Sequence, residues 1–166
     1  VKNQHHILLV DDLPENLKFL RGMLIKRGYL VRVAISGTLA LSSVKKNPPD
    51  LILLDIRMPG MDGFEVCQRL KEDESTRDIP VIFLSASDDV EDKIKAFSTG
   101  GVDYITKPFH RKEVLARIKN HLTLREVQKE VEEKNAQLSS LIDAIPDIVY
   151  FKDIQGRNLI VNSVFK

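Results

Sequence analysis

The chain has only one cysteine, Cys67, among its 166 residues. A single cysteine excludes an internal disulfide and fits a reducing compartment, so we expect a cytoplasmic protein. Cys67 is expected on a helix, where packing explains a cysteine better than catalysis does. No histidine accompanies it in a recognisable catalytic arrangement.

Long hydrophobic runs are also missing. The longest strand-like apolar runs reach about a third of the ~18 residues that a membrane-spanning helix needs. Residues 1–6 contain no apolar region of the kind found in secretory signals. We therefore expect neither a membrane span nor a secretory signal.

Neither sign of charge is in excess. The chain has 25 basic and 24 acidic residues, a formal net charge of +1. Such a balance offers no basic field for nucleic acid or for a membrane surface, so we expect neither as a partner of this chain. The length allows one good core and little more.

The first two-thirds of the chain alternate short apolar runs with segments of helical periodicity. We predict strands at 6–10, 31–35, 51–54, 80–84 and 102–105, and helices at 16–27, 37–46, 63–72, 90–98 and from 111 onward. Residues 51–54 are apolar on both faces, which is typical of a central parallel strand covered by helices on each side. The pattern predicts an α/β fold with a five-stranded, parallel, doubly wound (flavodoxin-like) sheet.

Two of these helices carry apolar faces that we expect to pack on the sheet. The faces are Leu17, Leu20, Leu24 and Ile25 in the first helix, and Leu115, Ile118 and Leu122 in the fifth. The fifth helix does not stop there, because no Gly or Pro occurs from residue 111 to about 142. We predict a continuous helix over 111–145.

A second apolar stripe follows along this helix, with spacings of three and four in a shifted phase. Its members are Leu124, Val127, Val131, Lys134, Leu138, Leu141 and Ile145. The stripe predicts a two-stranded parallel coiled coil, and hence a homodimer through residues 124–145. A lone solvated helix is the alternative, and Lys134 weakens the pairing locally.

After Pro146 the pattern becomes strand-like. Residues 147–153 and 159–162 predict two strands, and 154–158 a turn between them. A two-stranded hairpin is marginal in water by itself. Residues 146–166 are therefore expected to open a further domain.

Acidic residues follow two of the predicted strands. Asp11 and Asp12 come directly after 6–10, and Asp55 comes after 51–54. Because the carboxyl ends of parallel strands meet at one edge of a sheet, these acids should converge there with Ser85 and Lys107. Three adjacent carboxylates stay ionised only with a cation among them, and oxygen ligands of this kind suit Mg²⁺.

Such a site fits phosphoryl transfer. Lys107 would add a second positive charge and Ser85 a hydroxyl donor for phosphoryl oxygens. A carboxylate can itself be the nucleophile and form an aspartyl phosphate. Taken singly, the acidic pair could be a helix cap and Lys107-Pro108 a turn, but their joint order at strand ends makes chance a poor explanation.

Four motifs at these positions resemble the receiver domain of two-component response regulators, over about residues 5–122. They are Asp11-Asp12, the segment 55–63 (DIRMPGMDG), Ser85-Ala86, and the segment 101–109 (GVDYITKPF). The resemblance implies that Asp55 accepts phosphate from a histidine kinase or a histidine phosphotransfer protein. It sets the limits of the receiver domain at 1–122, of the coiled-coil linker at 111–145, and of the last segment at 146–166.

The resemblance also implies roles for the surrounding residues. Asp12, Asp55 and the backbone carbonyl of Arg57 would bind Mg²⁺, and Asp11 would orient the waters of the metal. Lys107 would pair with the phosphoryl group. Ser85 and Tyr104 would form a switch pair, in which the hydroxyl moves toward the phosphoryl group and the ring turns inward.

The output of such a chain is open at this point. Residues 141–162 are similar to the start of a PAS sensor domain, so the phosphorylation signal would be relayed through the coiled-coil helix to a C-terminal sensor or output region. The alternative is the N-terminal part of a hybrid sensor histidine kinase or a diguanylate cyclase. No kinase histidine box or nucleotide motif is present, and His121 does not resemble an acceptor histidine. A phosphohydrolase with an aspartate nucleophile would need a second carboxylate two residues after Asp55. Position 57 is an arginine, which argues against this class of enzyme.

Overall fold

The computed structural model describes residues 4–86 and 90–162. The chain divides into two compact units, the first ending at Thr123 and the second beginning at Leu124. The strands of the first unit are β1 (His6–Val10), β2 (Leu30–Ala34), β3 (Leu51–Asp55), β4 (Val81–Ser85) and β5 (Asp103–Thr106). Its helices are α1 (Pro14–Ile25), α2 (Gly37–Lys46), α3 (Gly63–Glu72) and α4 (Val90–Ser98), followed by α5 (Arg111–Asp143), which ends in the second unit.

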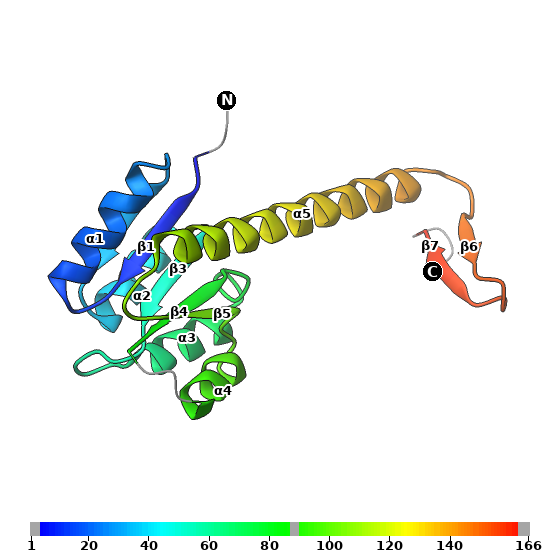
Figure 1. The fold of residues 1–166 in the computed structure, drawn as a ribbon. Helices are drawn as coiled ribbons and strands as arrows, with labels where there is room; N and C mark the ends of the chain where they lie inside the picture. The colour runs from blue at the N-terminus through cyan, green and yellow to red at the C-terminus, as the bar shows by residue number, and fades with distance from the viewer. Residues whose placement is uncertain (1–3, 87–89, 163–166) are drawn as a thin grey trace. The chain divides into compact units, whose positions relative to one another are not determined.

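The five strands form one sheet in the order β2-β1-β3-β4-β5 (Figure 1). Every pairing is parallel, which confirms the predicted doubly wound, flavodoxin-like sheet. All five residues of β3 are buried, as the apolar run predicted for a central strand. The strand order reverses between β1 and β3, and this is the place where such sheets leave an open crevice.

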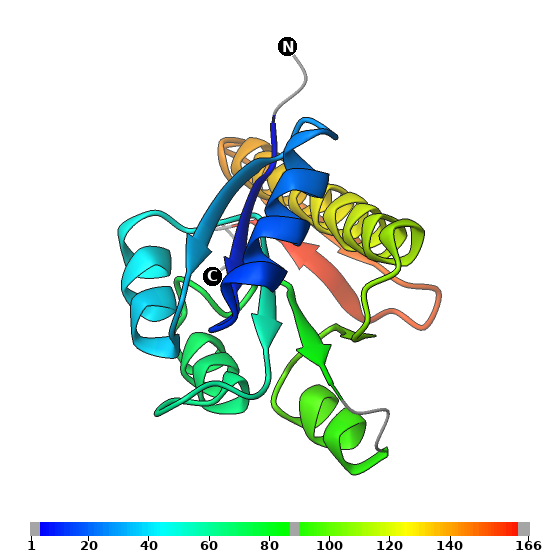
Figure 2. The ribbon, with the colours of Figure 1, turned by 60° about the vertical axis from the view of Figure 1, so that its left-hand side comes forward.

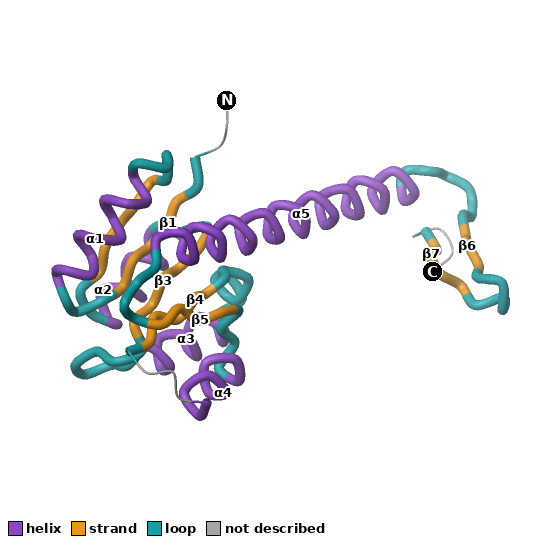
Figure 3. The backbone as a smooth tube through the Cα atoms, in the orientation of Figure 1, coloured by secondary structure: helices purple, strands orange, loops and turns teal. Residues whose placement is uncertain are grey.

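Helices cover both faces of this sheet (Figures 2 and 3). One core cluster joins β-strand side chains to α1 and α5, and the other joins them to α2, α3 and α4. In the part of α5 that belongs to the first unit, the buried residues are Val114, Ile118 and Leu122, with Leu115 partly buried. The predicted sheet-facing stripe of this helix is therefore confirmed, and Val114 joins it.

The packing face predicted for α1 was partly wrong. Leu17, Leu20 and Leu24 are buried, but Ile25 is 47% exposed and Met23 is buried in its place. Each residue of a helix is turned by about 100° from the one before, so Ile25 falls outside the arc of α1 that contains the buried residues. The helix also begins earlier than predicted, because Pro14 in the first turn is preorganised for helix geometry.

The second unit contains the end of α5 and an antiparallel hairpin, β6 (Tyr150–Lys152) with β7 (Asn158–Val161). The helix predicted over 111–145 is continuous but ends two residues early, at Asp143, shortly before Pro146. Two strands were predicted here, but the first is shorter than the predicted 147–153 and the second is shifted by one residue from the predicted 159–162. The turn of the hairpin is closed by the Asp153 carboxylate, which accepts hydrogen bonds from the backbone N–H groups of Gln155 and Arg157 at 2.9 Å each. The last residues of the predicted 146–166 segment, 163–166, lie outside the described residues.

The side chain of Asn162, which follows β7, is bonded to the segment that precedes β6. Asn162 is fully buried. Its side-chain amide donates to the carbonyl of Asp147 at 2.7 Å, and its side-chain oxygen accepts from the N–H of Val149 at 3.0 Å.

Among the described residues no helix combines the length and the apolar character that crossing a bilayer demands.

The start of α3 lies unusually close to the end of β3. The Gly63 N–H donates to the carbonyl of Ile56 at 2.9 Å. A Cβ atom at position 63 would stand 2.2 Å from the backbone oxygen of Asp55, well inside contact distance. Glycine is therefore required here by the position of Asp55.

We expect Gly63→Ala to lower the free energy of unfolding by about 1–3 kcal/mol or more, because backbone atoms must move to admit the methyl group. Gly22→Ala is the matched control. A Cβ at Gly22, inside α1, would meet nothing within 4 Å, so this change should stabilise the protein by up to about 1 kcal/mol. Urea denaturation of both variants measures the effect, and equal stability of Gly63→Ala and wild type would contradict the close approach.

Candidate functional site

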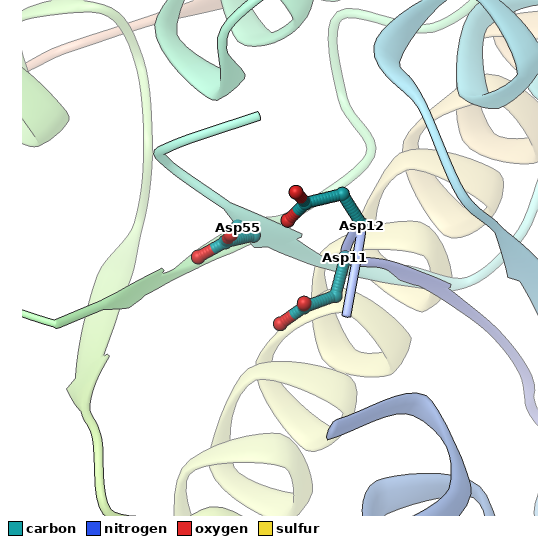
Figure 4. A group of neighbouring side chains, drawn as sticks. All are labelled: Asp11, Asp12 and Asp55. Carbon is teal, nitrogen blue, oxygen red and sulfur yellow. The ribbon is translucent and has the colours of Figure 1, made fainter. Parts of the chain in front are cut away.

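The acids predicted to converge do so at the carboxyl ends of β1 and β3. Asp11, Asp12 and Asp55 offer carboxylate oxygens that all lie within 4.8 Å of one another. Figure 4 shows the three side chains extending to the same side of the strand ends. Asp11 is fully buried, Asp55 is 4% exposed, and Asp12 is half-buried.

Lys107, from the loop after β5, lies between two of these acids. Its Nζ donates to Asp55 Oδ1 at 2.8 Å and to Asp11 Oδ2 at 3.0 Å. The backbone N–H of Lys107 donates to the carbonyl of Ser85 at 2.7 Å, which ties the loop to the end of β4. The Lys107–Pro108 peptide bond is cis.

Burial and charge act in opposite directions on this pair. Burial raises the pKa of Asp55 to about 6, although the Lys107 ammonium lowers it and Asp11 and Asp12 raise it further. Burial also disfavours the charge on Lys107, but the hydrogen bonds to Asp55 and Asp11 outweigh it and raise the pKa of Lys107 above its usual value. Lys107 therefore stays protonated, and the ion pair with Lys107 offsets only part of the cost of burying the charged form of Asp55.

One residue of the site was missed from the sequence. Asn16, in the first turn of α1, donates its side-chain amide to both oxygens of Asp11, at 3.1 Å to Oδ1 and 2.9 Å to Oδ2. The signal that could have found it is the early start of α1 at Pro14, which places position 16 on the turn that faces back toward Asp11.

The two residues of the predicted switch pair lie on neighbouring strands. Ser85 is 4% exposed at the end of β4, one residue beyond the register partner of Asp55. Tyr104 on β5 is half-buried, and its ring meets that of Phe97 edge-on with centroids 6.0 Å apart. The Tyr104 ring is therefore partly exposed at the edge of the sheet, beside α4.

Arg57 lies in the loop after β3, beside an open cavity of about 530 Å³ that reaches from Asp12 to α4. Its guanidinium is exposed and forms an ion pair of 3.6 Å with Asp92 on α4. The loop that follows Asp55 is thus linked to α4. The cavity gives groups from solvent access to Asp12, the member of the acidic cluster that lines it.

The donor set suits a small, hard divalent cation. Carboxylate oxygens are the ligands that Mg²⁺ prefers, and it commonly keeps waters and uses only one or two carboxylates. Asp12 and Asp55 can provide these carboxylates, and the cavity that Asp12 lines leaves room for water. The residues present therefore fit Mg²⁺.

The raised pKa of Asp55 means that its ionised form destabilises the metal-free fold. The carboxyl titrates near its ordinary value of 3.8 in the unfolded chain and near 6 in the folded one, so this contribution to stability falls as pH rises from about 4 to 6. Asp55→Asn removes the effect, and its stability relative to wild type should rise over that window by at most about 3 kcal/mol. Urea denaturation in EDTA at pH 4.5 and pH 7.5 tests this. A difference that does not vary with pH would contradict it.

Comparison with known proteins identifies the first unit. The family model of the response regulator receiver domain matches residues 7–119. The response regulator PleD of Caulobacter vibrioides is 39% identical over 130 residues, which are 78% of this chain and 29% of PleD. The DNA-binding dual master transcriptional regulator RpaA of Synechocystis is 44% identical over 113 residues, which are 68% of this chain and 47% of RpaA.

Solved structures agree. The signal receiver domain of a signal transduction histidine kinase from Syntrophus aciditrophicus superposes with a TM-score of 0.67 at 34% identity, covering 72% of this chain and 90% of that one. The chain spans less than half the length of the two curated relatives named above. The family model covers residues 7–119, which is most of the first unit. The chain therefore belongs to the response regulator receiver family, and its first unit is the phospho-accepting signalling domain of a two-component system.

Proposed function

We propose that Asp55 is the residue that accepts the phosphoryl group, as the motif at 55–63 predicted. Receiver domains are phosphorylated by histidine kinases or phosphotransfer proteins. A carboxylate oxygen of Asp55 would attack the phosphorus of a phosphohistidine, forming a P–O bond as the P–N bond breaks, and the released imidazole would take up a proton. The observation that carries the proposal is the buried Asp55 carboxylate, 2.8 Å from Lys107 and within 4.8 Å of two further acids.

The neighbouring residues have separate tasks in this proposal. Receiver domains bind Mg²⁺ through acidic residues, and here Asp12, Asp55 and the backbone carbonyl of Arg57 would hold it, with Asp11 orienting its waters. When bound, the ion supplies positive charge for the transferring phosphoryl oxygens. Lys107 supplies charge from the other side, by moving its ammonium from Asp55 to a phosphoryl oxygen.

Asp55→Asn should abolish phosphorylation by acetyl phosphate, because the amide is not a nucleophile. Asp78→Asn, at an exposed loop position, is the matched control and should be phosphorylated like wild type. Phos-tag electrophoresis after incubation with and without Mg²⁺ provides the readout. A shifted band in Asp55→Asn would place the acceptor elsewhere, and a wild-type shift that does not need Mg²⁺ would remove the metal from the proposal.

We further propose that Ser85 and Tyr104 convert phosphorylation into a change of shape. A phosphoryl group adds roughly −1.5 to −2 charge at neutral pH if it behaves like a phosphoester. The Ser85 hydroxyl, at the end of the strand next to Asp55, would move to a phosphoryl oxygen. The half-buried Tyr104 ring would then turn inward, which changes the surface made by α4, β5 and α5.

The apolar stripe on α5 supports dimerisation as the next step. Each of its hydrophobic members is at least 41% exposed in the single chain; those on α5 are Leu124, Val127, Val131, Leu138 and Leu141, and Ile145 lies just past the end of the helix. A heptad stripe of this kind is buried when two parallel helices pair. We therefore propose a homodimer through 124–145, a receiver domain at 1–122, a coiled-coil linker at 111–145, and a PAS-like segment at 146–166 that receives the signal.

Leu138→Lys should weaken the dimer roughly tenfold or more, because it places a charge inside the paired stripe. Ser139→Lys adds the same charge one residue away, on an exposed position outside the stripe, and should leave association unchanged. Lys134→Leu should tighten the dimer. Sedimentation equilibrium measures all three, and a wild-type monomer at high micromolar concentration would refute the coiled coil.

The output of the whole protein is a separate proposal. Hybrid signal transduction histidine kinase D of Dictyostelium discoideum is 34% identical to 87% of this chain, which corresponds to only 10% of that kinase. A relay to a C-terminal sensor or output region fits the long helix and the hairpin. The alternative is that the chain is the N-terminal part of a hybrid histidine kinase or of a diguanylate cyclase. The cytoplasmic location inferred from the single Cys67 stays a prediction.

A further inference from the structure

The Asp11 carboxylate is held by more donors than any role as a simple metal ligand would require. Oδ1 accepts from the backbone N–H of Leu13 at 2.9 Å and from the Asn16 amide at 3.1 Å. Oδ2 accepts from the same amide at 2.9 Å and from Lys107 Nζ at 3.0 Å. Each oxygen therefore has two contacts, and a carboxylate offers about four lone-pair sites in all.

A carboxylate with its acceptor sites occupied in this way cannot bind a cation directly without giving up a donor. Asp12 is different, because it is half-buried and lines the open cavity. Direct coordination therefore falls to Asp12 and Asp55. Asp11 is left to hold Lys107 at one oxygen and to orient the waters of the metal, as proposed above, through its fixed negative charge.

Asn16 is the donor that sets the orientation of this carboxylate. Leu13 and Lys107 each contact one oxygen, whereas Asn16 contacts both, so rotation of the Asp11 carboxylate about its Cβ–Cγ bond breaks at least one bond to Asn16. The orientation of the carboxylate in turn decides how far Oδ2 reaches toward Lys107.

A role in helix capping does not explain this contact. The N-cap of α1 is Leu13, for which the structure shows no side-chain capping bond, and the first turn is begun by Pro14. The Asn16 bonds that the structure shows go to Asp11, a residue outside the helix. The Asn16 amide therefore fixes the carboxylate of Asp11 at the end of β1 and does not cap the helix.

We propose that Asn16 is a positioning residue for Mg²⁺ binding and phosphoryl transfer, acting through Asp11 and not by contact with the metal or the phosphoryl group. The inference rests on the proposed function of the Asp55 site. Removal of groups that orient a metal site typically weakens metal binding by about 10–100-fold. Because Asn16 is one step further from the ion than Asp11, we expect an effect of about tenfold, at the lower end of that range.

The test is a double-mutant cycle on the dissociation constant for Mg²⁺, measured by amide NMR shifts of the full chain without a phosphodonor. Asn16→Ala should weaken Mg²⁺ binding about tenfold in the wild-type background and hardly at all in the Asp11→Asn background. Asn16→Leu, which keeps the volume, should behave like Asn16→Ala. Asn120→Ala, an exposed asparagine on α5, is the control and should bind Mg²⁺ as wild type does.

The outcomes separate the inference from the function beneath it. If wild type binds Mg²⁺ and is phosphorylated but both Asn16 variants bind Mg²⁺ within twofold of it, the positioning role is overturned while the Asp55 site stands. An equal loss in both backgrounds also overturns it, because Asn16 would then act independently of Asp11. If wild type neither binds Mg²⁺ nor becomes phosphorylated, the proposed function itself fails. Thermal unfolding of each variant shows that the comparison is between folded proteins.

Discussion

A single ammonium group makes this site possible. Lys107 lies between the carboxylates of Asp11 and Asp55, both almost completely buried. Two buried like charges without a counter-charge would cost several kcal/mol, which is a large part of the stability of a small domain. The loop after β5 must therefore close on the ends of β1 and β3, and the stability of the fold and the geometry of the acidic cluster depend on the same contact.

The topology explains why the acids meet at that place. β1 and β3 are neighbours in the sheet, but the helices that follow them, α1 and α3, pack on opposite faces. The chain diverges at this point, so neither helix covers the strand ends, and the cavity beside Asp12 remains open. Gly63 adds a local constraint, because only a residue without a side chain lets α3 begin so close to the Asp55 carbonyl.

Much of this arrangement could be predicted from the sequence. Each strand is an apolar run with turn residues at its ends, so the order of the elements can be read from the sequence. The convergence of Asp11, Asp55 and Lys107 then follows from the general rule that the carboxyl ends of parallel strands meet at one edge of the sheet. Asn16 was missed because its role depends on the direction of one side chain in the first turn of α1. The pairing of α5 that the stripe predicts stays a prediction, because a single chain does not contain the surface that would cover the stripe.

The bond between Lys107 and Asp11 joins residues 96 positions apart in the chain. During synthesis Asp11, Asp12 and Asp55 are therefore made before Lys107, the lysine that balances the charge of Asp11 and Asp55. With Asp55 as the proposed acceptor, the nascent chain lacks the electrostatic partner of that carboxylate until synthesis has passed β5. The site is then complete only when the last strand of the sheet and the loop after it have been made.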